Sequence, residues 1–385
     1  MTAHNEPSMG SVYDFCVIGA GIAGTSVAAE LARHASVLLL EMESQPGYHT
    51  TGRSAAVFAP VYGPQPIRAL TRASAAFYHN PPEDFATAPL LELLDVIMLA
   101  RADQEKHLAQ FLKEVGKEGA ISRIGADEIR KRNPLVRETY AHAGALDQTG
   151  SGIDVHALHQ GYLNTFRKAG GMLATNCKVE KLERRNGIWV IATASGVYQA
   201  ATIINAAGAW ADQVGAMAGA ERIGLVPKRR TALIVDAPDG LDTASLPLIV
   251  DIEEQFYMKA DAGRLLISPA NEDPMEPCDA QPDEMDIAIC IDRIQHAFDI
   301  EVRRIGNKWA GLRSFVADKV PVAGYSSAVG GFFWLAGQGG YGVQSAPALS
   351  RYAASLALGN DIPADILAAG LNPASIAPDR LRLAA

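Results

Sequence analysis

Cysteine is scarce in this sequence, and its spacing gives it no evident structural role. The 385 residues include four cysteines, Cys16, Cys177, Cys278 and Cys290, and no two of them form a CxxC pair. This spacing argues against a structural zinc site and indicates no disulfide framework. Because no other metal-ligand spacing is visible, we expect no metal site.

Basic charge and long apolar runs are also lacking. Lys and Arg number 34 against 43 Asp and Glu, for a formal net charge of −9, which argues against nucleic acid as the main partner. No apolar run approaches the roughly 20 residues that span a bilayer, and the first dozen residues do not resemble a secretory signal. We therefore expect a cytoplasmic protein without an integral membrane segment, and peripheral contact with the inner membrane stays open.

What remains is an ordinary globular composition. Hydrophobic residues make up 48% of the chain and charged residues 20%. A chain of this length and composition can bury a large core and form two domains.

The most informative segment is YDFCVIGAGIAGTSVAAELAR, residues 13–33. Its pattern predicts a strand over 13–19 and a helix over 21–33, and SVLLLE predicts a second strand over 36–41. Strand, helix and strand in this order form a βαβ unit.

The turn of this unit carries a GxGxxG motif. Gly19 permits the turn, Gly21 lets backbone N–H groups approach a pyrophosphate, and Gly24 allows close packing of helix on strand. Glu41 ends the second strand, where a carboxylate accepts hydrogen bonds from ribose hydroxyls. The motif in this context predicts a dinucleotide site.

The rest of the chain predicts further elements but no repeats. Helices are expected over 67–79, 102–118, 126–132 and 152–170, and a strand over 91–100. Strands of a meander are expected over 172–185, 187–193, 196–200 and 201–208, an antiparallel set over 228–269, and strand, glycine loop and helix over 331–358. The nucleotide unit does not account for 86–150 or 226–314, which predicts a second, inserted domain.

Three other segments favour FAD over NAD as the dinucleotide. Residues 47–55 (GYHTTGRSA) follow the second strand closely, and 202–212 (TIINAAGAWAD) is an apolar strand that breaks into small residues. Residues 337–344 (GQGGYGVQ) are a glycine loop that opens a late helix. Small residues are needed where the backbone passes close to a bulky ligand.

These segments resemble the D-amino-acid oxidase (DAO) family of FAD enzymes, and within it the bacterial D-arginine dehydrogenases. The resemblance runs from about 13 to 380 and is carried by VIGAGIAG, PGYHTTGRSAA, HQGYL, NAAGAW, PKRR, FYMKADAG, SPANEDP, WAGLRSFVAD and QGGYG. It implies an α/β fold: a Rossmann-like FAD-binding domain of glutathione-reductase type with an inserted α+β substrate domain built on an antiparallel sheet. The FAD-binding domain would comprise 12–85, 150–225 and 315–380, and the substrate domain 86–149 and 226–314.

The resemblance also implies which residues bind the cofactor. No cysteine lies in an evident flavin-linking motif, so we expect the FAD to be noncovalent. The residues expected against it are Gly19, Gly21, Ile22, Ala23, Gly24, Glu41, Met42, Thr50, Thr51, Gly52, Arg53, Ser54, Ala55, Val179, Ala206, Ala207, Gly208, Trp210, Gly311, Arg313, Gly339, Gly340, Tyr341, Gly342, Val343 and Gln344.

The implied reaction is oxidation of the Cα–N bond of a small amino-acid substrate, with hydride transfer to flavin N5. The imino acid formed is hydrolysed to an oxo acid and ammonia. The flavin supplies the redox chemistry, and the protein positions the reactants. A quinone, another carrier or O2 would accept the electrons, and the sequence does not separate a dehydrogenase from an oxidase.

Two arginines are candidates for holding the substrate carboxylate. Arg313 lies in the apolar segment WAGLRSF, and its guanidinium matches a carboxylate as a two-pronged donor. Arg230 in PKRR is a second anchor, and its neighbour Arg229 would point the other way on a strand. An internal ion pair is the alternative role for Arg313, and a surface position is the alternative for Arg230.

The resemblance adds three groups near the reacting carbon. Tyr257 and Tyr62 match family tyrosines whose hydroxyls face the substrate, although a tyrosine is often a core aromatic with a wet tip. The Gly340 carbonyl would accept from the amine, and the helix that starts around 341–344 would stabilise charge on reduced flavin. His49, His156 and His159 are expected to be structural or cofactor-packing residues.

Two positions depart from the arginine enzymes. Val96 stands where they carry a carboxylate for the substrate guanidinium, and Val57 stands where they have a histidine near the amine. Asp95 would point away from the pocket if the register is right; a one-residue slip would return Asp95 or Glu92 to it. We therefore expect apolar or aromatic side chains to be preferred over basic ones.

Other functions stay open at this stage. With the same cofactor, the substrate could be glycine, sarcosine, a proline-type secondary amine or a 2-hydroxy acid. A flavin-binding assembly subunit without its own chemistry is a third reading.

Overall fold

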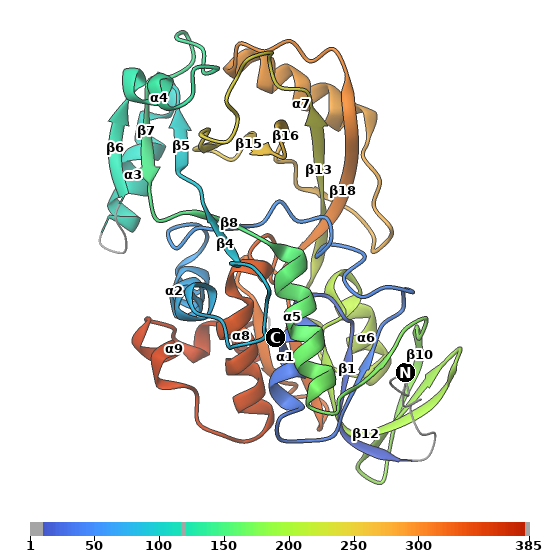
Figure 1. Cartoon of the computed structure of the whole chain (residues 1–385). Coiled ribbons are helices and arrows are strands. Elements are labelled where there is room, and N and C mark those ends of the chain that lie inside the picture. The colour runs from blue at the N-terminus through green and yellow to red at the C-terminus, as the bar shows by residue number, and fades with distance from the viewer. Residues whose placement is uncertain (1–10, 117–120, 382–385) are drawn as a thin grey trace.

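A computed structural model of the chain describes residues 11–116 and 121–381, and two large sheets dominate it (Figure 1). The first sheet has the strand order β10 (Val179–Arg185), β11 (Ile188–Thr193), β12 (Gly196–Asn205), β1 (Val12–Ile18), β2 (Val37–Leu40) and β9 (Met172–Ala174). β1 pairs in parallel with both β12 and β2. On the other side of β12 lies β20 (Phe332–Ala336), which pairs with β19 (Val322–Tyr325).

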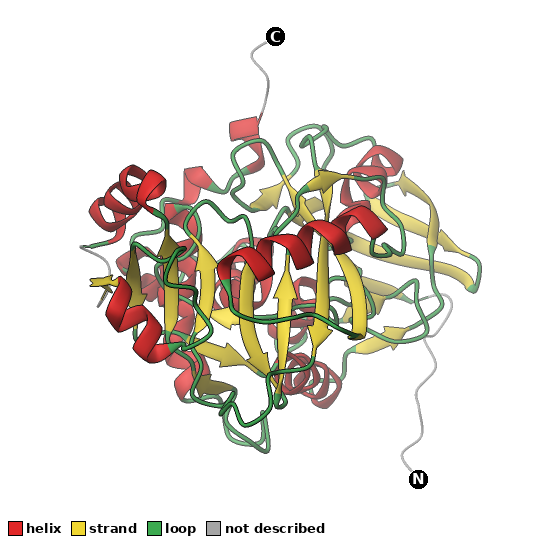
Figure 2. Cartoon of the chain, turned by 90° about the horizontal axis from the view of Figure 1, so that it is seen from above, coloured by secondary structure: helices red, strands yellow, loops and turns green. Residues whose placement is uncertain are grey.

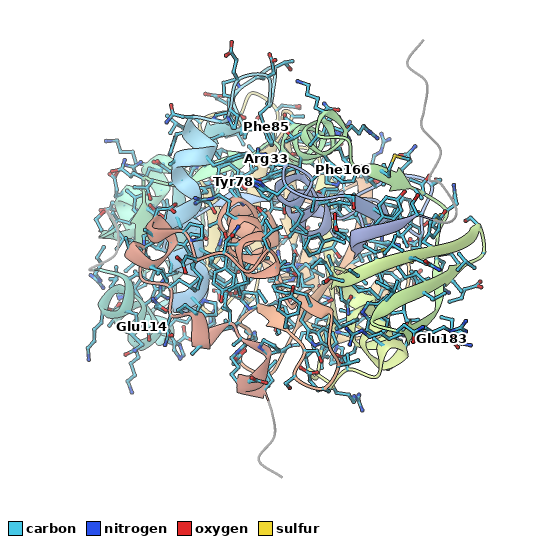
Figure 3. All side chains as sticks on the ribbon, turned by 90° about the horizontal axis from the view of Figure 1, so that it is seen from below. Arg33, Tyr78, Phe85, Glu114, Phe166 and Glu183 are labelled. Atoms are coloured by element: carbon cyan, nitrogen blue, oxygen red, sulfur yellow. The ribbon has the colours of Figure 1, made fainter. Side chains whose placement is uncertain are left out.

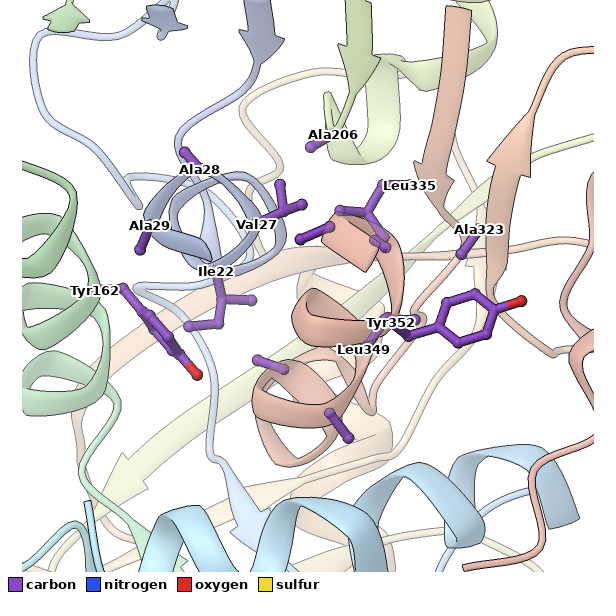
Figure 4. Close-up of a cluster of buried hydrophobic side chains, with 14 of the residues drawn as sticks. Ile22, Val27, Ala28, Ala29, Tyr162, Ala206, Ala323, Leu335, Leu349 and Tyr352 are labelled. Atoms are coloured by element: carbon purple, nitrogen blue, oxygen red, sulfur yellow. The ribbon is translucent and has the colours of Figure 1, made fainter. Parts of the chain in front are cut away.

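Helices cover one face of this sheet and form its largest core. α1 (Ile22–Leu31) packs against α5 (Val155–Lys168) and α8 (Gly342–Ala357), and α2 (Gln65–His79) packs on α8. Small side chains on α1, among them Ala28 and Ala29, allow this close approach, while Leu349 and Tyr352 of α8 fill the space beside it (Figure 4). The remaining helices at this end are α6 (Ala211–Ala218) and the short α9 (Ala364–Ala368).

The second sheet has the strand order β17 (Asp273–Pro274), β13 (Val226–Val235), β16 (Arg264–Ser268), β15 (Tyr257–Asp261), β14 (Leu248–Asp251), β5 (Val96–Ala100), β7 (Ala143–Asp147) and β6 (Ile121–Gly125). β18 (Ile305–Phe315) pairs along the length of β13. All pairings are antiparallel except β14 with β5, which is parallel.

Helices also flank the second sheet, as the view from above shows (Figure 2). α7 (Glu284–Ala297) and α4 (Ala126–Arg132) bury apolar side chains in the same core as one face of the sheet, and α3 (Glu105–Val115) buries Leu108 against the other. Charged side chains such as Glu114 and Glu183 lie at opposite margins of the molecule, whereas Tyr78 and Phe166 lie inside (Figure 3). The predicted mixed α/β fold is confirmed.

A small third sheet connects the two regions. It consists of β3 (Val57–Phe58), β8 (Ser151–Ile153) and β4 (Leu91–Leu93). Strands of the second sheet come from residues 96–147 and 226–315. This membership supports the predicted domain boundaries, which stay a prediction.

Several predicted elements have different bounds. The strand expected over 91–100 is two strands, because the chain leaves β4 at Leu94 and enters another sheet at Val96. The helix expected over 152–170 begins only at Val155, where the Asp154 side chain accepts a hydrogen bond from the Ala157 N–H. The meander prediction is wrong for β9, which pairs in parallel with β2.

Three other elements differ from the sequence-based expectation. Residues 196–205 form one strand, β12, rather than two. The helix expected over 102–118 is a 3-10 turn followed by α3. α7 was not predicted. In the part of the chain that the structure describes, no helix has the length and apolar character needed to cross a membrane.

Candidate cofactor and substrate site

The turn between β1 and α1 has the close packing expected of a dinucleotide-binding unit. Gly19 has a φ of +100°, and a Cβ there would lie 2.5 Å from the Ala206 carbonyl oxygen. A Cβ on Gly24 would lie 1.8 Å from the Gly19 carbonyl oxygen. Only glycine fits at either position, so the N-terminus of α1 can approach the ends of β1 and β12.

Glu41 lies just after β2 with its carboxylate buried beside this turn. One oxygen accepts from the Ala20 N–H at 2.7 Å, and the other accepts from the Glu43 N–H at 3.0 Å. The two bonds fix the orientation of the carboxylate, and carboxylate oxygens have further lone pairs for a ribose hydroxyl.

The segment 47–55 lies along the same turn and joins the two sheets. Thr51 Oγ1 accepts from the Ile22 N–H at 2.9 Å, and Thr50 Oγ1 donates to the Leu312 carbonyl at 2.7 Å. Arg53 donates to the Ala310 carbonyl at 2.9 Å and pairs with Asp279. These bonds hold the segment between α1 and β18.

An elongated cavity runs from the α1 turn to the α8 N-terminus. Most predicted cofactor residues line it: Gly19, Gly21, Ile22, Ala23, Glu41, Met42, Thr50, Thr51, Arg53, Ser54, Ala55, Val179, Ala206, Ala207, Gly208, Trp210, Gly311, Arg313, Gly339, Gly340, Gly342 and Val343. Gly24, Gly52 and Tyr341 do not line it; the two glycines permit close backbone packing, and Tyr341 is the N-cap residue of α8. Gln344 lines a second, adjoining cavity.

Sequence reasoning missed other residues that line the first cavity. Lys178 precedes the predicted Val179, and Gln338 precedes the predicted Gly339, so their position beside a motif was an available signal. Gln213 and Met217 of α6 had no such signal, since only the fold brings α6 to the cavity.

The two candidate arginines lie side by side on the β13–β18 ladder. Arg313 pairs with Lys228 and Arg230 pairs with Gly311, so the two arginines are diagonal neighbours on one face. Arg230 is 6% exposed, which rules out a surface role, and its Nη2 lies 3.4 Å from Glu272 Oε1. Arg229 points the other way, as predicted, and pairs with Asp286 at 2.7 Å.

The structure does not support the alternative role of Arg313 in an internal ion pair. Within 11–116 and 121–381, no carboxylate lies within 4.0 Å of its guanidinium. A Cβ on Gly340 would lie 2.7 Å from Arg313 Nη1, so the glycine makes room for the guanidinium beside the α8 turn. Arg313 is therefore held by shape and remains available to an anion.

The electrostatics of this cluster also favour an anion. Burial and the charge of Arg313 lower the pKa of Arg230. Burial, followed by the charge of Glu254, raises the pKa of Tyr62 well above its ordinary value, so its hydroxyl stays protonated at neutral pH. The cluster thus presents two buried guanidiniums, of which only Arg230 has a carboxylate nearby, and a neutral hydroxyl.

A second cavity opens from the first beside Arg313. Ser54, Ala55, Tyr257, Arg313 and Gly340 line both. The walls of the second cavity are mainly apolar and include Val57, Val61, Val96, Met98, Phe111, Ile121, Leu248 and Val250. Its polar lining residues are Tyr62, Asp147, Lys259 and Gln344 together with shared Ser54, Tyr257 and Arg313.

The two positions that depart from the arginine enzymes, Val57 and Val96, both line the second cavity. Asp95 does not line it, and its carboxylate instead accepts a hydrogen bond from Arg132 at 2.6 Å. Glu92 is exposed on β4. The alternative of a one-residue slip, which would return either acid to the cavity, is wrong.

The three histidines lie in three different environments. His159 is buried and bonds the Ala20 carbonyl at 3.0 Å, and burial lowers its pKa. His49 lines the first cavity, pairs with Glu43 at 2.9 Å and packs on Trp210. His156 is exposed.

Together, the sheet order, the glycine turn and the cavity beside it define a dinucleotide-binding protein. Residues 14–356 match the model of the family described as FAD dependent oxidoreductase (DAO). The chain belongs to this family, and it uses FAD.

Individual relatives span several substrates. The chain is 30% identical over 227 residues to L-2-hydroxyglutarate dehydrogenase of Escherichia coli K12. This match covers 54% of this chain and 51% of the relative, so it spans about half the length of that protein. It is 24% identical to glycine oxidase of Bacillus licheniformis, over 91% of this chain and 94% of the relative. Glycine oxidase from Geobacillus kaustophilus has a similar solved structure, with a TM-score of 0.81 at 20% identity, covering 94% of this chain and 98% of that one.

The first cavity fits FAD. Gly19 and Gly21 line it without side chains, and Glu41 lies at the ribose position of a dinucleotide motif. At the far end, Gly342 and Val343 bring the first turn of α8 to the cavity. The unpaired N–H groups of such a turn suit a developing negative charge.

Proposed function

We propose that this chain oxidises the Cα–N bond of D-amino acids, giving an imino acid that water hydrolyses to a 2-oxo acid and ammonia. The observation that carries the proposal is the Arg313 guanidinium at the junction of the two cavities, without a carboxylate partner among the described residues. Bound FAD would supply the two-electron acceptor. The D configuration and the place among D-arginine dehydrogenases derive from the family resemblance alone.

The chain's own groups would bind and orient the substrate. Arg313 would take the carboxylate through two parallel N–H bonds, and Arg230 would add charge from the neighbouring strand. The protonated Tyr62 hydroxyl and that of Tyr257 would hold the carboxylate or the amine. The Gly340 carbonyl would accept from the amine and so select the face of Cα that meets the flavin.

The second cavity would receive the substrate side chain. Its valine, isoleucine and leucine walls support the predicted preference for aliphatic and aromatic side chains. The expected disfavour of basic side chains depended on Val96 and Val57, which both line this cavity. Asp147 lies opposite Val96 on the next strand and lines it too, which supports a pocket that also accepts a basic group.

A second candidate function keeps the cofactor and changes the substrate. Glycine, sarcosine, a proline-type secondary amine or a 2-hydroxy acid would use the same arginine clamp. The similarity to glycine oxidase and to L-2-hydroxyglutarate dehydrogenase supports this alternative about equally.

Anaerobic bleaching of the flavin tests the proposal. The FAD-loaded protein is mixed with D- and L-amino acids, glycine, sarcosine, proline and 2-hydroxy acids, and the loss of flavin absorbance is followed by stopped flow. We expect D-amino acids with bulky side chains to bleach it fastest. Faster bleaching by a secondary amine or a hydroxy acid would favour the alternative, and admission of air would then separate an oxidase from a dehydrogenase that needs a quinone or another carrier.

A further inference from the structure

We propose that Asp147 recognises the end of the substrate side chain and selects one that ends in a hydrogen-bond donor, such as an ammonium, guanidinium or amide group. The inference rests on the proposed function, because it takes the second cavity as the side-chain pocket. Neither the glycine motif nor the arginine clamp requires this carboxylate.

One carboxylate oxygen of Asp147 accepts two hydrogen bonds, and the other accepts none from the described groups of the chain. The side chain is 2% exposed, and its Oδ1 accepts from the Thr149 N–H at 2.8 Å and from Thr149 Oγ1 at 2.6 Å. Oδ2 is buried and has no hydrogen-bond partner among the described groups of the chain. A buried acceptor without a partner destabilises the free protein, so a ligand donor that reaches Oδ2 gains from satisfying it.

The sheet places this carboxylate in the cavity wall. Asp147 pairs with Val96 of β5 on one side and with Ile121 of β6 on the other, and all three line the second cavity. Ala143 and Ala145 precede it at intervals of two and lie on the same apolar face. Asp147 is thus an acid at a position where the face is otherwise apolar.

The pocket's lysine does not neutralise this acid. Lys259 also lines the cavity, and burial lowers its pKa although the charges of Asp261 and Glu92 act in the opposite direction. No basic group lies within 4.0 Å of Asp147 in the described ranges. The carboxylate is therefore directed to whatever occupies the cavity.

Val96 is apolar, but the strand register places a carboxylate opposite it, so the pocket can still distinguish polar from apolar side chains. Val96 of β5 and Asp147 of β7 occupy directly opposed positions, with the two Cα atoms paired across the ladder. Opposed residues on one face have Cβ atoms about 5 Å apart, so a flexible side chain could reach either position.

Ligand binding tests this without turnover. The FAD-loaded protein is titrated with 4-aminobutanoate, 5-aminopentanoate and 6-aminohexanoate, each against the carboxylate of the same shape that ends in methyl, and the flavin spectrum reports binding. We expect at least one amino-terminated ligand to bind tenfold or more tightly than its methyl partner. Equal binding within every pair, or tighter binding of the methyl partner throughout, would overturn the proposal.

Substitution of Asp147 tests whether this residue causes the preference for amino-terminated ligands. Asp147→Asn keeps the shape and an acceptor for Thr149 but removes the charge, and we expect it to reduce the tenfold preference to threefold or less. Asp95→Asn is the matched control, since Asp95 neighbours Val96 but lies outside the cavity, and it should leave the preference unchanged. A preference that survives Asp147→Asn would show that another group makes it.

Turnover separates this inference from the proposed function. D-Ornithine and D-norleucine have side chains of one shape, and we expect kcat/KM to favour D-ornithine tenfold, with the advantage lost in Asp147→Asn. If no amino acid bleaches the flavin while the amino-terminated ligands still bind more tightly, the proposed function fails and the Asp147 site stands. If D-norleucine is the better substrate in the wild type, the Asp147 site fails and the proposed function stands.

Discussion

At the residue scale, two buried guanidiniums on one face of a ladder define what the site can hold. Arg230 and Arg313 are diagonal neighbours, and Arg313 is one cause of the lowered pKa of Arg230. Like charges this close repel each other, so a carboxylate placed beside them relieves the repulsion as well as forming hydrogen bonds. The site is therefore built for an anion.

Removing Arg313 should abolish substrate anchoring. Two charge-assisted hydrogen bonds of about 1.5–3 kcal/mol each are removed in Arg313→Met, and we expect kcat/KM to fall by about 100-fold or more. Stopped-flow flavin reduction measures this fall in FAD-loaded protein, with rates normalised to bound flavin because Arg313 also lines the cofactor cavity. Arg303→Met, at an arginine 82% exposed, is the control. A variant that retains kcat/KM within threefold would contradict the anchoring role.

The arginines could be predicted from sequence, but Asp147 could not. Arg313 stands out because a charge directly after the apolar run Trp309 to Leu312 needs a reason, and period-two alternation separates Arg230 from Arg229. Asp147 is the last residue of the segment AGALD, and nothing in the sequence distinguishes it from another polar residue at the end of a strand. Its unpaired oxygen depends on β5, β6 and Thr149, and only the tertiary structure brings these together.

At the scale of the element, the α1 turn depends on an absent side chain. The Gly24 backbone lies so close to the Gly19 carbonyl that a Cβ would approach to 1.8 Å. The helix cannot shift away easily, because its other faces pack on α5 and α8. FAD binding at this turn and the packing of α1 therefore both depend on the absence of a side chain at Gly24.

Gly24→Ala should separate α1 from β1 and weaken FAD binding. Overpacking of this kind costs about 1–3 kcal/mol or more, and we expect FAD occupancy after purification to fall at least tenfold, with a lower Tm. Gly125→Ala is the matched control, because a Cβ there meets nothing within 4 Å. Flavin content measured after acid release gives the result, and wild-type content in Gly24→Ala would contradict the account.

Element boundaries were predicted less well than element types, for physical reasons. Residues 91–100 are mostly apolar and suggest one strand, yet the Leu94 N–H bonds the Gly150 carbonyl and Asp95 pairs with Arg132, so the chain changes sheets there. Both partners are distant in sequence. By contrast, the start of α5 had a local signal in the Asp154 cap that favoured the shorter helix.

At the scale of the whole molecule, a charged network around Glu272 joins β13 to the chain after β18. Glu272 pairs with Lys228 and Lys319, each at 2.9 Å, and lies 3.4 Å from Arg230. Burial alone would raise its pKa, but the hydrogen bonds from the two lysines outweigh this effect and lower the pKa to about 2. The ionised form therefore stabilises the folded state.

The stabilisation by Glu272 should depend on pH. A lowered pKa adds stability that is complete above the ordinary carboxyl value of about 4.5 and is lost as the pH falls toward about 2. After allowance for solvent screening, we expect Glu272→Gln to reduce the free energy of unfolding at pH 7 by on the order of 1–2 kcal/mol. Urea denaturation from pH 7 down to pH 3 should show this difference shrinking. Glu276→Gln, at an exposed acid nearby, should show none, and a pH-independent difference would refute the assignment.

The junction of the two cavities is a property of the whole chain. Ser54, Tyr257, Arg313 and Gly340 come from four distant segments, and the sequence predicted each as a site residue through motifs rather than through their mutual geometry. The order of strands in the second sheet, including the parallel pair β14–β5, follows from long-range packing that no local pattern encodes.

A crystal structure with FAD and a short-chain carboxylate bound would test the central claim most directly. We expect both carboxylate oxygens within about 3.2 Å of the Arg313 guanidinium nitrogens, with the alkyl chain in the second cavity between Val96 and Leu248. A carboxylate bound elsewhere, with Arg313 turned from the junction to a carboxylate of the protein, would contradict it.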